Sequence, residues 1–225
     1  MTTANKKKIA SRPVLVTGFE PFAGEIDNPS LEIARALDGK RIAGHPVVGA
    51  ILPTEFRRSL TVLGALLKRN RPQLVIAVGQ AGGRSQICLE RVAINLIDAR
   101  ISDNAGEQPV DVPVIRDAPS AYFSTLPLKA MLQGLIASGI PAVLSQSAGL
   151  YVCNQVMFGL LHQLQELRPR ARGGFVHVPF LPQQATRHYN APSMTLATMI
   201  QALTLCIETA LATGDDLHFA AGATH

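Results

Sequence analysis

The sequence predicts an α/β protein in which a mostly parallel sheet is covered by helices on both faces. Short apolar runs alternate with stretches whose leucines and alanines recur at helical spacing. The alternation continues through both halves of the chain, and strands buried on both faces are typically continuous apolar runs. Of the 225 residues, 47% are hydrophobic and 16% are charged, a composition that supplies one large core. A single domain is therefore expected.

The first half of the chain supplies apolar strands that end near glycine. The run PVLVT stops at Gly18, and the run QLVIAV stops at Gly79. Pro29 suits the first turn of a helix, and Thr54 is a plausible N-cap for the next helix. The predicted elements are strands 13–17, 46–52 and 73–78 and helices 29–37 and 54 to about 70.

The second half repeats this alternation after a less regular middle. Residues 88–98 mix β-branched and polar residues and indicate a strand or a hairpin arm. Residues 105–124 are dense in proline and turn residues, which predicts an irregular loop over a site. The remaining predicted elements are strands 142–145 and 174–178 and helices 128–138, 154–167 and 192 to about 212.

Composition and charge narrow the classes of function. The formal charge is +5, but Lys6, Lys7 and Lys8 lie in a basic leader, 1–12, that we expect to lack regular structure. We also expect a frayed tail over 214–225. The other arginines form no basic stripe with exposed aromatics, so no nucleic-acid partner is predicted. Without a secretory apolar region or a membrane-spanning run, the chain is predicted to be soluble, cytoplasmic and without a membrane partner.

The number and positions of the cysteines indicate that at least one is a reactive thiol. The three cysteines are odd in number and scattered, with neither a disulfide framework nor the paired spacing of a zinc site. Cys153 follows strand 142–145 by a short turn and immediately precedes a predicted helix, whose free N–H groups and dipole lower a thiol pKa. The alternative is a cysteine that only packs, which is the expectation for Cys88 and Cys206.

A histidine and a carboxylate lie, as Cys153 does, at the edge of the predicted sheet. In such sheets ligands bind beyond the carboxyl ends of the strands. His177 ends strand 174–178, although a lone histidine in an apolar strand is more often a satisfied core residue. Glu90 lies in an apolar strand, and its alternative role is a salt bridge with Arg91 or Arg100. Cysteine, histidine and carboxylate fit the roles of nucleophile, base and orienter, but their spacing leaves open whether they meet.

Four separate stretches carry a family resemblance. They are GFEPFAG with DNPS (18–30), GQAGGRSQICLERVAINLIDARISDNAGEQP (79–109), SAGLYVCN (147–154) and GGFVHVPFLPQQ (173–184). In this order they resemble the pyroglutamyl peptidase type I family, also called pyrrolidone carboxyl peptidases. The resemblance runs from about residue 14 to 212, and four ordered motifs are far more specific than one short pattern.

The resemblance implies a single-domain three-layer α/β/α sandwich that assembles as a homotetramer without metal or cofactor. It implies a cysteine peptidase that releases an N-terminal pyroglutamyl residue from peptides through a thioester intermediate. The family's nucleophile matches Cys153, its base His177 and its carboxylate Glu90. Its oxyanion arginine matches Arg100, beside the backbone N–H of Cys153. The residues matching its pyroglutamyl pocket are Phe19, Phe22, Ile101, Tyr151 and Val152, with Gln80 bonding the lactam through its backbone.

Departures from the family pattern leave the required groups in place. Leu150 stands where threonine is common, Ala23 where a second glycine is usual, and Cys88 with Leu89 replaces a threonine-proline pair. Two other classes of protein stay open. A phosphorylase-like nucleoside- or phosphate-binding protein would use GQAGGR to present N–H groups to an anion and would not need the thiol. A catalytically silent relative would serve as a subunit, which the intact catalytic positions argue against.

Overall fold

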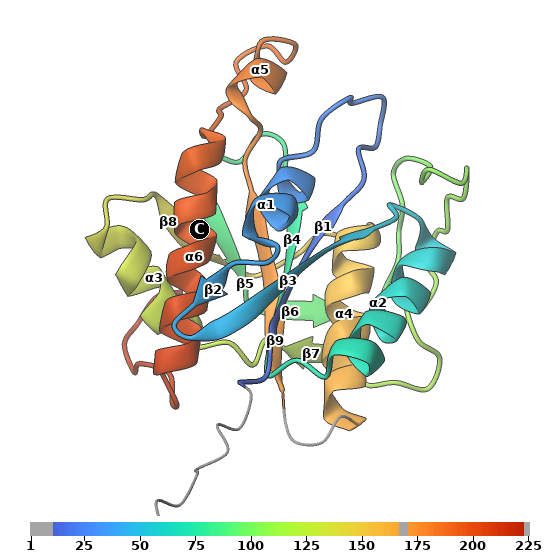
Figure 1. Ribbon diagram of the computed structural model, residues 1–225. Coiled ribbons are helices and arrows are strands. Elements are labelled where there is room, and N and C mark those ends of the chain that lie inside the picture. The colour runs from blue at the N-terminus through green and yellow to red at the C-terminus, as the bar shows by residue number, and fades with distance from the viewer. Residues whose placement is uncertain (1–10, 167–170, 223–225) are drawn as a thin grey trace, which may run out of the picture.

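A central sheet organises the part of the chain that the computed structural model describes, residues 11–166 and 171–222 (Figure 1). Over these residues the sheet has seven strands in the order β2-β3-β1-β4-β9-β5-β8. The strands are β1 (Val14–Phe19), β2 (Arg41–Ile42), β3 (His45–Leu52), β4 (Leu74–Gln80), β5 (Ile87–Glu90), β8 (Ala142–Ser145) and β9 (Arg172–Val178).

Four neighbouring strands of the sheet run in one direction, and β5 and β8 run in the opposite direction. Strands β3, β1, β4 and β9 are parallel neighbours. Strand β5 runs antiparallel to β9, and β8 runs parallel to β5. As a result, the carboxyl ends of β1, β4 and β9 lie at the same edge of the sheet as the amino ends of β5 and β8. The predicted mostly parallel sheet is confirmed.

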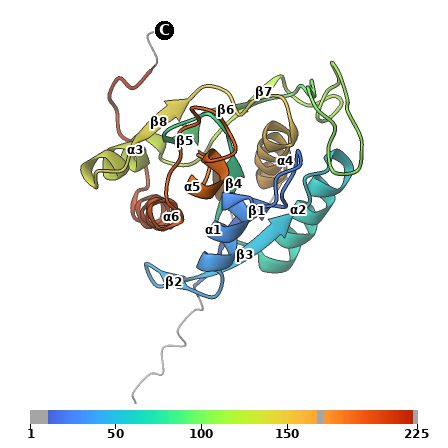
Figure 2. The ribbon, with the colours of Figure 1, turned by 90° about the horizontal axis from the view of Figure 1, so that it is seen from above.

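Helices cover both faces of the sheet, as the alternation of patterns predicts (Figure 2). One apolar core lies beneath α1, α3 and α6, and a second lies beneath α2 and α4. The three-layer α/β/α arrangement is therefore confirmed. The helices are α1 (Pro29–Leu37), α2 (Phe56–Asn70), α3 (Leu128–Ala137), α4 (Val152–Glu166), α6 (Leu196–Ala212) and the short α5 (Pro182–Ala185).

Two short strands depart from the sequence prediction. The expected arm 88–98 is divided between β5 and a separate strand β6 (Val92–Ile94), which leaves the main sheet. Strand β6 pairs antiparallel with β7 (Ala121–Phe123), inside the stretch predicted to be irregular. Each strand of this two-stranded sheet has three residues, too few to show a period of two. Packing against α4 therefore places strands that the local pattern does not predict.

The start of α2 is also capped differently from the prediction. The hydroxyl of Thr54 donates to the carbonyl of Glu20 at 2.9 Å instead of capping the helix. The carboxylate of Asp103, distant in sequence, accepts from the backbone N–H of Phe56 at 2.7 Å. A cap supplied from another segment leaves no local signal, so the sequence prediction chose the nearest hydroxyl.

The segment after α6 is held against the domain over the residues described. We expected a frayed tail, but the carboxylate of Asp216 accepts from the backbone N–H groups of Lys129, at 3.0 and 3.1 Å, and Ala130, at 3.0 Å. These are orphan donors of the first turn of α3, so the tail caps that helix. At the other terminus residues 1–10 of the predicted leader lie outside the described residues, and Ser11 donates to the carbonyl of Gly44 at 3.0 Å.

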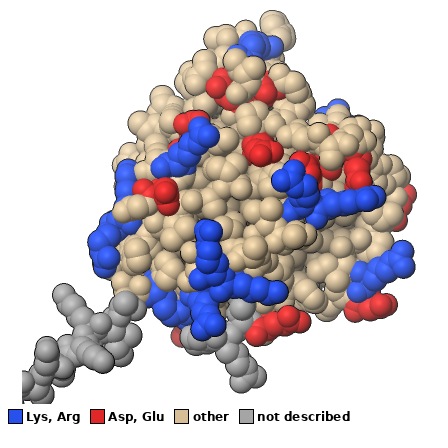
Figure 3. Space-filling model, turned by 45° about the vertical axis from the view of Figure 1, so that its right-hand side comes forward, with Lys and Arg blue, Asp and Glu red and all other residues tan. Residues whose placement is uncertain are grey.

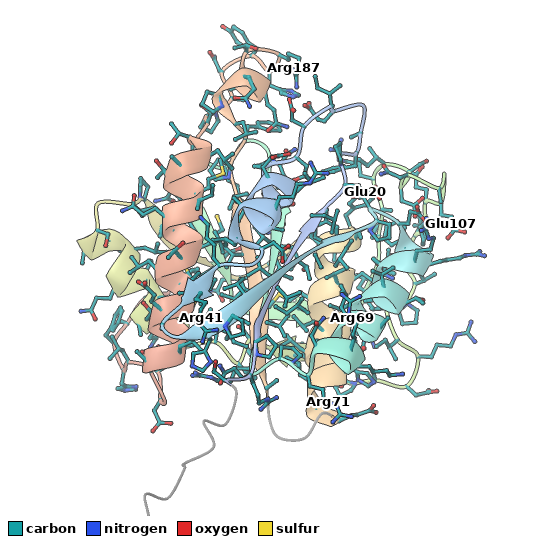
Figure 4. The ribbon with its side chains drawn as sticks, in the orientation of Figure 1. Glu20, Arg41, Arg69, Arg71, Glu107 and Arg187 are labelled. Carbon is teal, nitrogen blue, oxygen red and sulfur yellow. The ribbon has the colours of Figure 1, made fainter. Side chains whose placement is uncertain are left out.

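Charge is spread unevenly over the surface. In Figure 3 lysines and arginines gather toward the lower part of the face shown. Figure 4 places Arg41, Arg69 and Arg71 in the lower half, toward the amino ends of the parallel strands, and Arg187 at the top beside α5. On the face shown, most of the basic side chains therefore lie away from the edge where β1, β4 and β9 end. Among the described helices, none is long and apolar enough to cross a membrane.

If Asp216 caps α3, Asp216→Ala will lower the free energy of unfolding by about 1 kcal/mol, because it strands two helix N–H groups. Urea denaturation followed by circular dichroism would measure this. The matched control is Asp215→Ala, a change to an exposed neighbour, for which we expect less than about 0.5 kcal/mol. Equal losses for both variants would contradict the capping role.

Candidate active site

Cys153 lies in the first turn of α4, which begins at Val152, two residues earlier than the sequence predicts. Polar side chains from the same turn anchor this end of the helix on two sides. The amide of Asn154 donates to the carbonyls of Ile94, at 2.9 Å, and Leu96, at 3.0 Å. The amide of Gln155 donates to the carbonyl of Phe56 at 2.7 Å. The helix start is thereby tied to β6 and to α2, which holds the thiol in place.

The thiol of Cys153 lies over the carboxyl end of strand β4 because Gly79 has no side chain. A Cβ added to Gly79 would lie 3.0 Å from Sγ of Cys153 and 2.7 Å from the ring of Phe175. Gly79 is the Cα partner of His177 across the parallel β4–β9 pair. Residues opposed in this way point to the same face of the sheet. The structure therefore brings the thiol and the imidazole together as neighbours, which spacing alone left open.

The imidazole of His177 is held by a buried carboxylate. Its Nδ1 donates to Oε1 of Glu90 at 2.8 Å, and Glu90 has no exposed surface. The ring also contacts that of Phe175, with centroids 4.7 Å apart. Since a carboxylate only accepts hydrogen bonds, Nδ1 carries the proton, and Nε2 is left to act as an acceptor. Glu90 and His177 are thus bound to each other, and the roles of orienter and base stay predictions.

The cation that pairs with Glu90 is Arg84, not the Arg91 or Arg100 considered from the sequence. Nη1 of Arg84 donates to Oε1 of Glu90 at 2.7 Å, and Nη2 donates to the carbonyl of Ser147 at 3.1 Å. Arg84 thus joins the carboxylate to the turn that leads into α4 and Cys153. Arg84 was not predicted as a partner of Glu90, because only the turn at Gly82 and Gly83 directs its side chain back over β5. The one available signal was an arginine closing the GQAGGR stretch.

The thiol is protonated at neutral pH in this arrangement. Burial, together with the nearby carboxylate of Glu90, raises the pKa of Cys153 to about 12, although Arg84 and a backbone hydrogen bond act to lower it. The sequence predicts a lowered pKa at the start of a helix, and that prediction is wrong in direction, because loss of solvent around the sulfur outweighs the dipole. A proton acceptor beside the sulfur is therefore needed to produce the thiolate.

A small apolar pocket adjoins the thiol. It is nearly closed, with a volume of about 10 Å³, which is room for about one water molecule. The ring of Tyr151 lies between those of Phe22 and Phe56, at centroid distances of 6.0 and 5.3 Å. The pocket includes five predicted residues, Phe19, Phe22, Gln80, Tyr151 and Val152, together with Cys153 and with Asn28 and Thr54, which sequence reasoning did not select.

Two predicted site residues lie on the loop that runs beside the turn before α4. The backbone N–H of Asp98 donates to the carbonyl of Leu150 at 3.1 Å, and the hydroxyl of Tyr151 donates to the carbonyl of Ser102 at 3.0 Å. Arg100 and Ile101 lie between these two bonds. Arg100 is exposed, and within the described chain it makes no hydrogen bond or ion pair. Ile101 is half-buried and is not one of the residues that line the pocket.

A buried glutamine braces the pocket from behind. The amide of Gln184, which has no exposed surface, donates to Oε1 of Gln80 at 2.8 Å and to the carbonyl of Asp27 at 3.1 Å. Glu25 binds both Arg187, at 2.8 Å, and His188, at 2.6 Å. The segment that carries Phe22 is thus joined to α5 above the carboxyl edge of the sheet (Figure 1). Sequence reasoning did not select this network.

No group of three or more histidine, cysteine or acidic side chains in residues 11–166 and 171–222 is arranged to hold a metal ion. The free thiols are Cys88, Cys153 and Cys206. Cys206 is fully buried in α6, in the core on the other face of the sheet, which fits its predicted structural role. Cys88 is the Cα partner of His177 on β5 and is buried beneath Arg84.

Comparison with known proteins matches this geometry to one family. The family model described as pyroglutamyl peptidase matches residues 12–213. A pyrrolidone-carboxylate peptidase of Yersinia pestis (strain Pestoides F) is 51% identical over 214 residues, which is 95% of this chain and 100% of the relative. One from Erwinia tasmaniensis is 54% identical, with the same coverage. The family predicted from the four stretches is confirmed.

Solved structures agree with this assignment. The crystal structure of pyroglutamyl peptidase I from Bacillus amyloliquefaciens superposes with a TM-score of 0.89 at 43% identity, covering 92% of this chain and 100% of that chain. The pyrrolidone carboxyl peptidase from Thermococcus litoralis superposes with a TM-score of 0.89 at 41% identity, covering 93% and 99%. In both comparisons the match extends over nearly the whole chain, so the sandwich fold is shared.

Replacing Arg84 by methionine is expected to lower the free energy of unfolding by about 2–3 kcal/mol, because the buried carboxylate of Glu90 loses a charged donor. Urea denaturation would measure the loss, and Arg84→Lys should recover part of it. The matched control is Arg57→Met. Arg57 pairs with Glu107 at the same N–O distance of 2.7 Å, but its side chain is 83% exposed, so less than about 1 kcal/mol is expected. Similar losses at both sites would show that Arg84 does not support a buried charge.

Alkylation of Cys153 by iodoacetamide is expected to accelerate throughout pH 6–9. Below a pKa of about 12 the thiolate fraction rises about tenfold per pH unit, so the rate should keep rising as pH increases. Mass spectrometry of the modified peptides would follow Cys153 separately from the other cysteines. A rate that levels off near neutral pH would indicate a preformed thiolate and contradict this view of the resting site.

Proposed function

Since the chain belongs to the pyroglutamyl peptidase family, we propose that it removes an N-terminal pyroglutamyl residue from peptides, with Cys153 as nucleophile. In this proposal His177 is the general base and Glu90 orients it. One observation carries the assignment: the sulfur lies against Gly79, whose strand partner is His177, and Nδ1 of that histidine is already bound to Glu90 at 2.8 Å. Nucleophile, base and orienter are then consecutive neighbours.

The pocket beside the thiol supports recognition of a small neutral ring. Flat apolar walls from Phe19, Phe22 and Tyr151 suit a lactam, and backbone groups near Gln80 would pair its amide and carbonyl. A pocket of about 10 Å³ does not admit such a ring without movement. Phe22 and Tyr151 are half-buried, so we propose that these two rings part when the substrate enters.

The acylation step follows from the positions of the groups. Nε2 of His177 accepts the proton of Sγ, and the thiolate attacks the carbonyl that joins the lactam to the next residue. The backbone N–H of Cys153, in the first turn of α4, has no partner within the helix and is proposed to bind the oxyanion. Arg100, exposed and without a partner in the described chain, is proposed to supply a second donor when substrate is present.

The second half of the reaction returns the site to its resting state. The C–N bond breaks as the imidazolium of His177 gives its proton to the leaving amine, which leaves a thioester on Cys153. Water, deprotonated by the same imidazole, attacks the thioester carbonyl and releases pyroglutamate with the thiol restored. Glu90 holds the ring in one orientation throughout both halves and stabilises the imidazolium.

The other classes of function are less well supported by the site. A phosphate-binding role would need the GQAGGR turn to receive an anion, but the cation of that turn, Arg84, is engaged by Glu90 at 2.7 Å. A silent relative would not need the thiol, imidazole and carboxylate to be adjacent. A cytoplasmic location stays a prediction of the sequence pattern, and a homotetramer stays a prediction of the family resemblance.

The proposal is tested with pyroglutamyl, prolyl and glutamyl amides that share one leaving group, assayed with reducing agent and without phosphate. We expect turnover of the pyroglutamyl amide alone. The prolyl analogue lacks the lactam carbonyl and adds a charged amine, which a hydrogen-bonding pocket penalises by about 10⁴-fold or more in kcat/KM. Comparable kcat/KM for all three would sink the assignment.

The nucleophile is tested in the same assay. Cys153→Ser is expected to lose about 10⁴-fold or more in kcat, because the catalytic groups act as one unit. Cys206→Ala, a change to a thiol buried in the opposite core, is the control and should keep most activity. Activity that survives in Cys153→Ser but not in folded Cys206→Ala would contradict the proposed nucleophile.

A further inference from the structure

An open hollow lies next to the catalytic groups on the side away from the apolar pocket. It has a volume of about 320 Å³, far larger than the nearly closed pocket of about 10 Å³. Hollows of similar size beside β7 and beside α3 contain none of the catalytic groups or their direct partners. This one contains Arg84, the ion-pair partner of Glu90. It is lined by Gly83, Arg84, Ser85, Gln86, Cys88, Val143 and Ser145.

Strand register connects the hollow to the catalytic histidine. His177 on β9 is the Cα partner of Cys88 on β5, and Cys88 is the partner of Val143 on β8. With Gly79 on β4 these residues form one row across neighbouring strands, and partners in a row point to the same face. The sulfur of Cys153 lies over Gly79. Thiol, imidazole and hollow therefore follow one another in a line across the sheet.

The apolar pocket lies at the opposite end of this line. Two of its residues, Phe19 and Gln80, are the last residues of β1 and β4. The strand order β1-β4-β9-β5-β8 places them on one side of His177 and the hollow on the other. A substrate whose ring occupies the pocket and whose carbonyl meets Cys153 has its leaving nitrogen at His177, which must protonate it. The chain beyond that nitrogen then points toward β5 and β8.

We propose that this hollow binds the leaving peptide, over the first two or three residues after the scissile bond. The inference rests on the function proposed above. Neighbouring strands are about 4.8 Å apart, so Val143 lies about 10 Å from His177 along the row. Three extended residues, at about 3.3 Å each, span that distance.

The chemistry of the hollow fits a neutral peptide. Val143 is 37% exposed, an apolar surface on the edge strand against which a side chain of the peptide would pack. The amide of Gln86 and the guanidinium of Arg84, whose side chain is 33% exposed, offer hydrogen bonds to peptide carbonyls. Because Arg84 is neutralised by Glu90, the hollow has no net charge that would select an acidic peptide. It would bind through the backbone and one apolar side chain.

A length series tests the inference. The substrates are pyroglutamyl-alanine amide and its extensions by one, two and three residues with leucine at the third leaving position, and kcat/KM is measured for each. For the wild-type protein we expect kcat/KM to rise up to the third leaving residue and then level off. In Val143→Trp, which fills the hollow, the ratio of kcat/KM for the longest to the shortest substrate should fall about tenfold, the scale of one lost apolar contact.

Two further variants keep the test decisive. Val143→Thr, close in size to valine, guards against misfolding and should lower the same ratio by a smaller factor. Ile136→Trp is the matched control, because Ile136 is an exposed aliphatic residue on α3, which packs on the other face of the sheet. It should leave the ratio as in the wild type. A ratio that neither valine variant changes, or that the control lowers equally, would overturn the inference. Failure of the proposed function would look different, as no turnover of even the shortest substrate.

Discussion

A carboxylate with no exposed surface, that of Glu90, is the constraint on which the rest of the site depends. A buried charge is costly unless it is paired and hydrogen-bonded, so its partners must be held in place by the fold. Oxygen Oε1 accepts hydrogen bonds from Nη1 of Arg84, at 2.7 Å, and from Nδ1 of His177, at 2.8 Å. One atom therefore sets the tautomer of the histidine and draws the 81–84 turn over β5. Through its bond to Ser147, Arg84 extends this arrangement to the turn that precedes Cys153.

Close packing at Gly79 completes the arrangement. The sulfur of Cys153 and the ring of Phe175 occupy the space that any side chain at this position would need. The same ring touches the imidazole of His177 at a centroid distance of 4.7 Å. Strand β4 thus leaves a space at Gly79 where a side chain would stand. Strand β9 contributes the aromatic and imidazole rings beside that space. A larger residue at this position would push the sulfur of Cys153 and the ring of Phe175 away from the strand.

This packing also explains the resting state of the thiol. Removing water from around the sulfur raises its pKa to about 12, beyond what the start of a helix offsets. In the proposed mechanism the thiol is therefore kept protonated until a base takes the proton, and the adjacent pocket has a volume of only about 10 Å³. Under the proposed mechanism, attack follows only when a substrate opens the pocket beside the imidazole.

The sequence by itself determined the elements whose signals are local. The apolar runs that became β1 and β4, the proline that opens α1 and the family motifs around Cys153 and His177 all depend on neighbouring residues, so they could be predicted. The tertiary structure decided what depends on residues that the chain brings together from afar. This group includes the pairing of β6 with β7 and the cap that Asp103 gives α2. It also includes the pairing of Glu90 with Arg84 and the direction of the thiol pKa. The physical reason is that desolvation and charge pairing act through space, and the space around a residue is filled mostly by residues distant from it in sequence.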